Sequence, residues 1–414
     1  MSTAPPPLAN RTFLLCLAGV TLSSADQALF SFAIPGIIEE FDVGLGKISL
    51  LLTASFAFAT LIIIPIGLLA DAVGRRWLFA GLLAVSSLCV GGQALAPDFT
   101  TLAILRILSF GIAAGLYPLA NTLVIEAAPR RARGLLSGLL QIGYPLGFFI
   151  GSLIALPLIE SRGWRGIFLP AFLFVPLAFA IGGALKETAL ERIRQAVKQG
   201  ERSFAAPLRY LMQSGYRRTA LLCLGGSFAV SLAIGSFTYF IPTYLADAHG
   251  ADLGSATRIT GISYAIGAIG YIAAAIVGEY LLGRRNTLVL WTWLGALTLA
   301  FAVWIATEPA VLVAALGITV MFLFGTEAVR MPLIGESFPT AIRATATSLS
   351  GSLGVTTGWL SAPLIVAVSV PHMGWEATYG IVACLPLLAA GGLFALLPRY
   401  APITRTAVNP SPPS

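Results

Sequence analysis

The sequence predicts an all-α membrane protein with twelve transmembrane helices in two six-helix bundles. The composition is the first observation: 57% of the 414 residues are hydrophobic and only 10% are charged, too little polar surface for a soluble protein. The second is a series of twelve apolar runs, each about as long as a helix that crosses a bilayer. The third is a set of motifs that recurs about 210 residues later in the chain.

The apolar runs give the order of the predicted spans. One long polar stretch separates six spans from six. Four segments therefore follow: an N-terminal bundle over 1–185, a cytoplasmic linker over 186–218, a C-terminal bundle over 219–400 and a disordered tail over 401–414. The predicted spans are 12–36, 48–70, 77–96, 99–125, 134–158, 164–185, 219–245, 259–282, 287–307, 309–334, 344–370 and 374–397.

Three short motifs occur once in each half of the chain. They are Gly74-Arg75-Arg76 with Gly283-Arg284-Arg285, Glu126-x-x-Pro129-x-x-x-Arg133 with Glu336-x-x-Pro339-x-x-x-Arg343, and Gly163-Trp164 with Gly374-Trp375. Their displacements are 209, 210 and 211 residues. Chance does not readily produce three motifs at one displacement, so we expect two related six-helix units.

The basic residues indicate the orientation in the membrane. With a cytoplasmic N-terminus, 19 of the 25 Lys and Arg lie on the inner side and 4 on the outer side. The basic residues that give the net charge of +7 are thus distributed as membrane topology requires, and the charge does not indicate a nucleic-acid partner. We expect a multi-pass protein of the inner (plasma) membrane with both termini in the cytoplasm. The segment before the first span lacks a basic region and a cleavage site, so that span should remain as an anchor.

A charged turn follows the second apolar run. Residues 67–76 read Gly-Leu-Leu-Ala-Asp-Ala-Val-Gly-Arg-Arg, which resembles the signature loop between helices two and three of the major facilitator superfamily of transporters. The resemblance implies two bundles with the transport path between them, and a gating role for Asp71 and Arg75. The N-terminus of the eleventh span, near Ala344, would attract the Asp71 carboxylate. Tyr280 stands where the second half would repeat Asp71, so we expect a one-sided latch.

The duplicated Glu-x-x-Pro-x-x-x-Arg motif is similar to inner-face motifs of the sugar, metabolite and aromatic-acid symporter branches of the superfamily. This resemblance implies a gating role for Glu126, Arg133, Glu336 and Arg343 at the inner mouth. Helix caps and positive-inside anchors are the alternative, but they explain the arginines and not two glutamates at matched positions. The motif favours uptake branches over drug exporters.

Charged residues in mid-membrane are the main candidates for function, because each costs about 2.5–3.5 kcal/mol at the centre of a span. Asp26 and Arg106 come out at similar depth, roughly 10 Å below the outer edge at 1.5 Å per residue. We expect Asp26 to bind the coupling proton, and Arg106 to tune it or to hold an anionic substrate. A permanent structural bridge is the alternative. Glu327 and Arg330, three residues apart, should neutralise each other and serve the substrate or a gate.

Further polar residues could complete a substrate cavity. Gly111 and Gly115, which follow Arg106, resemble the fourth-span motif of the superfamily and should allow close helix packing. Hydrogen-bonding and aromatic groups could line the cavity, although each one alone is more often a packing residue. These candidates are Tyr117, Asn121, Gln141, Tyr144, Tyr239 and Tyr264.

Two departures bear on the substrate. Aromatic-acid symporters carry Asp-Gly-x-Asp in the first span, whereas residues 23–26 read Ser-Ser-Ala-Asp and keep only the second Asp. Residues 143–151 partly resemble a glycine and proline motif of drug/proton antiporters, but Tyr144 interrupts it. The chain offers neither a Ser/His triad within the membrane nor a phosphate-binding loop, so we expect no enzyme and no ATP-driven pump.

These observations predict a proton-coupled secondary transporter that imports a small organic anion, such as an aromatic carboxylate. The alternatives are a sugar or neutral-metabolite proton symporter, a drug/proton antiporter, and a transporter-like receptor that binds without translocating. We expect no cofactor and no metal, with the proton as the coupling ion. The expected partners are a small-molecule substrate and the lipid bilayer, with no nucleic acid, for a protein that acts as a monomer.

Overall fold

The computed structural model describes residues 10–129, 133–185, 216–339 and 346–398, and the regular structure of these residues is helical. The first half contains α1 (Arg11–Phe41), α2 (Leu45–Val73), α3 (Arg75–Gln93), α4 (Phe99–Ala114), α5 (Leu116–Ala127), α6 (Arg133–Leu140), α7 (Gly143–Gly166) and α8 (Ala171–Ala184). The second half contains α11 (Arg217–Thr238), α12 (Ile241–His249), α13 (Leu253–Ile276), α14 (Arg284–Trp304), α15 (Pro309–Glu336), α17 (Leu353–Tyr379) and α18 (Leu385–Ala395). Three π-helical turns adjoin them at Val277–Leu281, Ser348–Ser352 and Gly380–Cys384.

The helices have the length and surface of membrane spans. Within the described residues, nine helical stretches are long and apolar enough to cross a bilayer. Large apolar side chains lie on the outside of the molecule; along α2, for example, Leu61, Ile64 and Leu68 are each about 70% exposed. Such a surface is unfavourable in water and is matched by lipid.

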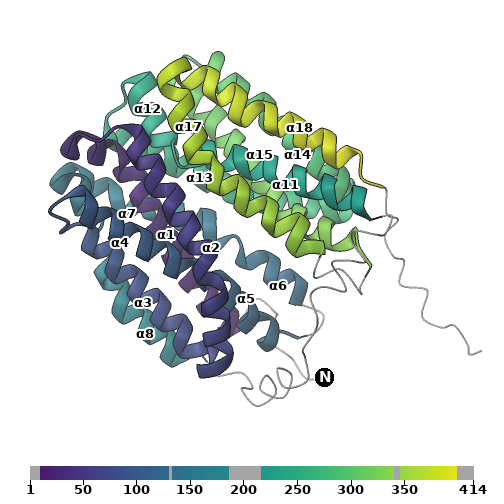
Figure 1. Ribbon diagram of the computed structural model, residues 1–414, viewed down its shortest axis with the longest axis horizontal. Coiled ribbons are helices and arrows are strands. Elements are labelled where there is room, and N and C mark those ends of the chain that lie inside the picture. Colours follow the sequence, from purple (N-terminus) through teal and green to yellow (C-terminus); the bar gives the residue numbers. More distant parts are fainter. Residues whose placement is uncertain (1–9, 130–132, 186–215, 340–345, 399–414) are drawn as a thin grey trace, which may run out of the picture.

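The two halves of the chain form two neighbouring groups of helices (Figure 1). The purple-to-blue helices α1–α8 lie together, and the green-to-yellow helices α11–α18 lie beside them. In the first group α1 packs against α7, and in the second α11 packs against α17. Contacts of α7 with α13 and of α2 with α17 join the groups.

The repeated glycines take the same backbone conformation in both halves. Gly74 and Gly283 have φ values of 100° and 76°, and Gly163 and Gly374 have φ values of 64° and 78°. L side chains rarely adopt these values, so glycine is the natural residue where one helix stops and the next begins. The duplication in the sequence is therefore a duplication of helix corners.

The arginines of the repeated motif also have equivalent partners. Arg76 donates to the Gly182 carbonyl at 2.5 Å, and Arg285 donates to the Phe394 carbonyl at 3.3 Å. Each acceptor lies at the end of the last helix of its half, where carbonyl groups lack partners within the helix. We call this end of the molecule, where α1, α3, α11 and α14 begin, the basic end.

The other end of the molecule carries the repeated tryptophans. Trp164 donates from Nε1 to Glu40 at 2.8 Å, and Trp375 donates from Nε1 to Asp247 at 3.2 Å. Arg165 adds an ion pair to Glu40 at 2.7 Å. The Gly-Trp motif therefore ties a helix corner to a carboxylate in each half.

Exposed aspartates cap two helices at this end. Asp98 accepts from the backbone N–H of Thr101 at the start of α4, and Asp252 accepts from the backbone N–H of Ser255 at the start of α13. The backbone and side-chain hydrogen bonds from Thr101 lower the pKa of Asp98. The pKa of Asp252 is lowered chiefly by the Ser255 hydroxyl and also by its backbone N–H. Both caps therefore stabilise the protein in their ionised form.

Several predicted spans contain a break between two helices, although Phe99–Ala127 and Leu136–Gly166 each form one stretch that is long and apolar enough to cross a membrane. The predicted span 99–125 is divided into α4 and α5, 134–158 into α6 and α7, and 219–245 into α11 and α12. In each case the second helix begins within three residues of a proline: Pro118, Pro145 or Pro242. Proline lacks an N–H and is tolerated in the first turn of a helix, so it favours a restart there. Hydropathy does not register such breaks.

Glycines allow the closest helix contacts. A Cβ atom on Gly147 of α7 would lie 2.5 Å from the Cβ of Ser24 on α1, and one on Gly358 of α17 would lie 2.7 Å from the Phe228 carbonyl oxygen on α11. A Cβ atom on Gly115 would lie 2.7 Å from Ile66 on α2, which agrees with the predicted close packing. The glycines of residues 143–151 thus have a packing role that does not depend on export.

Candidate functional site

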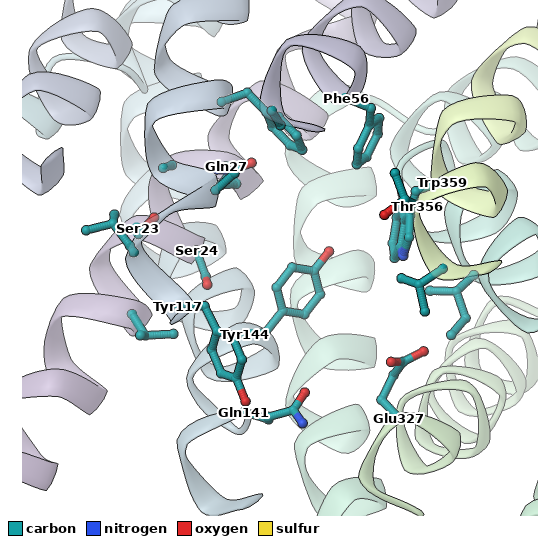
Figure 2. Close-up of a pocket in the computed structure, with 18 of the residues that line it drawn as sticks. Ser23, Ser24, Gln27, Phe56, Tyr117, Gln141, Tyr144, Glu327, Thr356 and Trp359 are labelled. Atoms are coloured by element: carbon teal, nitrogen blue, oxygen red, sulfur yellow. The ribbon is translucent and has the colours of Figure 1, made fainter. Parts of the chain in front are cut away.

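A cavity of about 430 Å³ lies between the two halves of the molecule. Figure 2 shows Ser23, Ser24 and Gln27 of α1 on one wall, and Glu327 of α15 with Thr356 of α17 on the facing wall. Its size falls in the range that holds a small organic molecule. It is lined by Val20, Ser23, Ser24, Gln27, Phe56, Ala59, Thr60, Ile63, Phe110, Ala113, Ala114, Leu116, Tyr117, Gln141, Tyr144, Ile234, Tyr239, Tyr271, Phe324, Glu327, Val355, Thr356 and Trp359.

Aromatic rings from both halves surround the cavity. Phe56 of α2 stacks on Trp359 of α17 with ring centroids 5.6 Å apart, and both rings meet Tyr239 edge to face. Tyr144 of α7 meets Phe324 of α15 edge to face at 5.7 Å. These rings pack against one another and give the cavity an aromatic, largely apolar wall.

Hydrogen bonds between the halves lie towards the end opposite the basic end. Ser31 of α1 donates to the Tyr239 carbonyl at 2.9 Å, and Thr53 of α2 donates to the Leu360 carbonyl at 3.2 Å. Ser31 lies 20 residues, or about 30 Å, along α1 from its start at the basic end. These bonds hold the halves together on that side of the cavity.

Asp26 and Arg106 lie beside the main cavity and line one narrow crevice between α1, α3 and α4 that has no room for a water molecule. Asp26 is 3% exposed and accepts a hydrogen bond from Ser87 of α3 at 2.6 Å. Arg106 is 1% exposed, with its guanidinium carbon 4.2 Å from the centre of the Phe30 ring. In the described part of the chain, the Oδ1 atom of Asp26 and the Nε and Nη2 atoms of Arg106 have no hydrogen-bond partner.

The two buried charges are thus close but do not form an ion pair with each other among the described residues. Ser23 and Gln27 line both the crevice and the main cavity, and so connect Asp26 with the main cavity. A buried charge without a full set of hydrogen-bond partners is costly. Binding of a proton to Asp26, or of a ligand beside Arg106, would therefore lower the free energy of burying these charges.

Glu327 and Arg330 form an ion pair on α15, in which Arg330 is buried and Glu327 is half-buried. Arg330 donates to Glu327 at 2.5 Å, which confirms that the two neutralise each other on one helix face. Arg330 also donates to the Ser231 hydroxyl at 3.0 Å and is fully buried. Glu327 therefore faces the main cavity with Arg330 behind it.

The structure places the remaining predicted cavity residues in two groups. Tyr117, Gln141, Tyr144 and Tyr239 line the main cavity. Asn121 instead accepts from Ser137 at 2.7 Å, and the buried Tyr264 donates to the Thr238 carbonyl at 3.1 Å. These two side chains serve helix contacts.

Several lining residues were not predictable from the sequence, among them Ser23, Gln27, Phe56 and Trp359, nor was the hydrogen-bond donor Ser87. Small polar and aromatic side chains are frequent in apolar helices, so nothing in the sequence singles them out. The spacing of Ser23 and Gln27 to Asp26 on one helix is the only available indication.

A family model described as Major Facilitator Superfamily matches residues 16–328. The chain belongs to the major facilitator superfamily. It is accordingly a multi-pass membrane transport protein and not an enzyme.

Its curated relatives within the superfamily are transporters. The cis,cis-muconate transport protein of Acinetobacter baylyi is 27% identical over 91% of this chain and 93% of that protein. The 4-hydroxybenzoate transporter of Pseudomonas aeruginosa is 26% identical over 94% of this chain and 92% of that protein. The gallate transporter of Pseudomonas putida is 26% identical over 82% of this chain and 81% of that protein. The resemblance to metabolite and aromatic-acid transporters is confirmed.

Solved structures share the superfamily fold. A D-xylose-proton symporter has a TM-score of 0.71 at 19% identity, covering 94% of this chain and 98% of that chain. An inward-facing bacterial homolog of the human lysosomal transporter Spinster has a TM-score of 0.71 at 16% identity, covering 94% and 95%. The all-helical membrane fold predicted from the sequence is confirmed.

The superfamily motifs at the basic end form ion pairs within each half. Glu126 pairs with Arg75, and Glu336 pairs with Arg284 at 2.7 Å. Arg284 also pairs with Glu279, the neighbour of Tyr280, at 2.6 Å. The partner of each predicted glutamate is thus an arginine of the Gly-Arg-Arg motif in the same half.

The other gating candidates are less fully described. Arg133 donates to the Ala128 carbonyl at 3.3 Å. The backbone of Asp71 lies in α2, its side chain is outside the described residues, and Arg343 lies outside them altogether.

Proposed function

We propose that this protein is a proton-coupled secondary transporter that imports a small organic anion, such as an aromatic carboxylate, by alternating access. Asp26 takes up a proton from the outside, Arg106 supplies positive charge for the substrate carboxylate, and the two halves rock about the cavity. Deprotonation of Asp26 on the cytoplasmic side then releases proton and substrate. The relatives named as muconate, gallate and 4-hydroxybenzoate transporters support an anionic substrate.

One observation carries the proposal: a buried carboxyl and a buried, incompletely bonded guanidinium line the same narrow crevice beside the main cavity. Ser23 and Gln27 form the border between the crevice and the main cavity. A negative charge near Arg106 lowers the cost of its burial, whether that charge is on Asp26 or on a substrate. Protonation of Asp26 would therefore remove the negative charge beside Arg106 and favour binding of the substrate carboxylate in its stead. In this way proton binding and substrate binding are coupled.

The proposed architecture has twelve spans in two six-helix bundles, joined by a cytoplasmic linker over 186–218. The protein lies in the inner (plasma) membrane with both termini in the cytoplasm. The excess of Lys and Arg at the basic end supports that orientation. The hydrogen bonds from Ser31 and Thr53 then close the outer side of the cavity. On this orientation the state described here faces inward.

The remaining residues take supporting roles in the proposal. Tyr117, Gln141, Tyr144, Tyr239 and Glu327 contact the substrate. Arg330, Asn121 and Tyr264 act through the side chains and helices that they hold. The ion pairs of Arg75 with Glu126 and of Arg284 with Glu336, together with Asp71, Arg133 and Arg343, belong to the gate at the basic end.

Replacing Asp26 by Asn tests the coupling. Asp26→Asn should abolish uphill uptake into proteoliposomes with an imposed proton gradient, and it should spare substrate exchange across the same membrane. Asp42→Asn is the matched control, because Asp42 is exposed at the end of α1 and its φ of 47° suits asparagine. Normal accumulation by Asp26→Asn would refute the proposed proton site.

Replacing Arg106 by Ala tests the substrate charge. Affinity for a carboxylate substrate should fall at least about tenfold, the loss that follows from removing about 1.4 kcal/mol of charge attraction. Arg106→Lys keeps the charge and should restore part of the affinity. Unchanged affinity in Arg106→Ala would remove this residue from the site.

The sugar symporter and the drug/proton antiporter are the alternatives. The aromatic walls and the carboxylate of Glu327 favour the antiporter over the sugar symporter, since lipophilic cations bind aromatic faces and acids. Competition for transport distinguishes the three functions. Carboxylates should displace the substrate of an organic-anion importer, sugars that of a sugar symporter, and lipophilic cations that of a drug/proton antiporter.

A further inference from the structure

The main cavity is polar on two facing walls and aromatic between them. Figure 2 places Ser23, Ser24 and Gln27 on one side, and Glu327 and Thr356 on the other. The first wall offers hydroxyl and amide donors in front of the Arg106 crevice. The second wall offers a carboxylate. A ligand that spans the cavity therefore meets different chemistry at its two ends.

Glu327 presents an acceptor to the cavity. One carboxylate oxygen accepts the 2.5 Å bond from Arg330. The other oxygen, Oε1, is buried and has no hydrogen-bond partner in the described part of the protein. An oxygen of an arginine-bound carboxylate acts as a hydrogen-bond acceptor, so a ligand that reaches Oε1 can satisfy it only with a donor.

Arg330 neutralises the charge of the pair but offers no hydrogen-bond donor to a ligand. Its side chain is fully buried, and it donates to Ser231 at 3.0 Å and to the Ser227 carbonyl at 3.4 Å. It lies behind Glu327 and does not line the cavity. A second carboxylate on a ligand would therefore meet the unbonded Glu327 oxygen with no donor between them, and a contact between two acceptors is unfavourable.

We propose that Glu327 is a specificity-determining residue: it selects monocarboxylates with a hydroxyl or amino donor at the end remote from the carboxylate, and it rejects dicarboxylates. The proposal rests on the proposed import of an organic anion, whose carboxylate lies towards α1 and Arg106. The rings of Tyr144, Tyr239 and Trp359 accommodate a flat body between the two ends. The selection follows because a donor on the ligand pairs with the Glu327 carboxylate. A ligand without that donor leaves the carboxylate oxygen without a partner and binds more weakly.

Ring-matched probes test the proposal on the purified full-length protein. Benzoate, 4-hydroxybenzoate, 4-methoxybenzoate and terephthalate share one ring and one carboxylate, and differ only at the far end. Calorimetric titration should give about tenfold tighter binding of 4-hydroxybenzoate than of 4-methoxybenzoate, the usual effect of a hydrogen bond to a charged group. Terephthalate should bind at least about tenfold more weakly than benzoate.

Two variants remove the selection. In Glu327→Gln the preference for the hydroxyl should fall below about threefold and terephthalate should bind as well as benzoate. Because the lone Arg330 could destabilise this variant, the double variant Glu327→Leu/Arg330→Met removes the whole pair and should show the same loss of selection. Glu160→Gln, an exposed glutamate on α7, is the matched control and should keep the wild-type preferences.

Each outcome decides the proposal. Equal binding of the hydroxy and methoxy probes to the wild type, tight binding of terephthalate, or unchanged preferences in both variants would overturn the role of Glu327 and leave anion import standing. If none of the four carboxylates binds the wild type while lipophilic cations do, the proposed function fails, and this proposal fails with it.

Discussion

The hydrogen bonds that join the two halves should set the balance between conformations. Ser31 donates to the Tyr239 carbonyl and Thr53 to the Leu360 carbonyl, and both acceptors belong to the other half of the chain. An intramolecular hydrogen bond contributes about 0.5–1.5 kcal/mol net. Removing both in Ser31→Ala/Thr53→Val should therefore cost the closed state about 1–3 kcal/mol, because the carbonyls regain water only when this side opens.

That energy corresponds to a rise of about 5-fold to 150-fold in the ratio of open to closed molecules at this end. Spin labels at Lys47, at the start of α2, and at Met373, in the last turns of α17, report the separation by pulsed electron paramagnetic resonance. The double variant should gain a population at longer distance, in a background without the native cysteines.

A serine that bonds within its own helix provides the control. Ser236 of α11 is buried like Ser31 but donates to the Leu232 carbonyl at 2.7 Å. Ser236→Ala should leave the distance distribution unchanged. An unchanged distribution in the double variant, or an equal shift in the control, would refute the assignment of these bonds to the closure.

Three further substitutions test the packing, the basic end and a helix cap. Gly358→Ala should lower stability by about 1–3 kcal/mol in thermal unfolding, because its Cβ would lie 2.7 Å from a carbonyl of α11, whereas Gly392→Ala has open space and should be tolerated. Glu336→Gln should cost less than about 1 kcal/mol in the same assay, because the pair is exposed and Arg284 keeps a second carboxylate; a larger loss would show that the pair is not a simple surface bridge. Asp252→Asn should lower the melting temperature slightly at neutral pH, since the folded-state pKa of the carboxyl is depressed and its ionised form stabilises the cap. This difference should vanish as the pH falls through the lowered pKa, and a difference that persists in acid would contradict the charge effect.

The mid-membrane charges were identifiable from the sequence because an ionised group inside a span is expensive and needs a reason. Asp26, Arg106, Glu327 and Arg330 all lie in or beside the main cavity and the crevice. Their detailed relations were not predictable: Asp26 bonds to Ser87 and not to Arg106. Which of these contacts forms depends on how α1, α3 and α4 pack.

The uncharged lining residues were not predictable either. Gln27 and Phe56 belong to the first two helices, whereas Trp359 belongs to α17 in the other half of the chain. Polar and aromatic residues also occur throughout apolar helices as packing groups, so their chemistry alone does not distinguish a cavity wall. The proline-associated helix restarts escaped prediction for a related reason, since apolar runs continue through them.

The sequence by itself determined the membrane location, the helical class and the duplication, because hydropathy and repeated motifs are properties of the chain that need no partner. The tertiary structure alone decided which charges pair, which side chains share a cavity and which end the halves close. Those features depend on distances between segments far apart in the chain. They also depend on a balance of a few kcal/mol between conformations of one sequence.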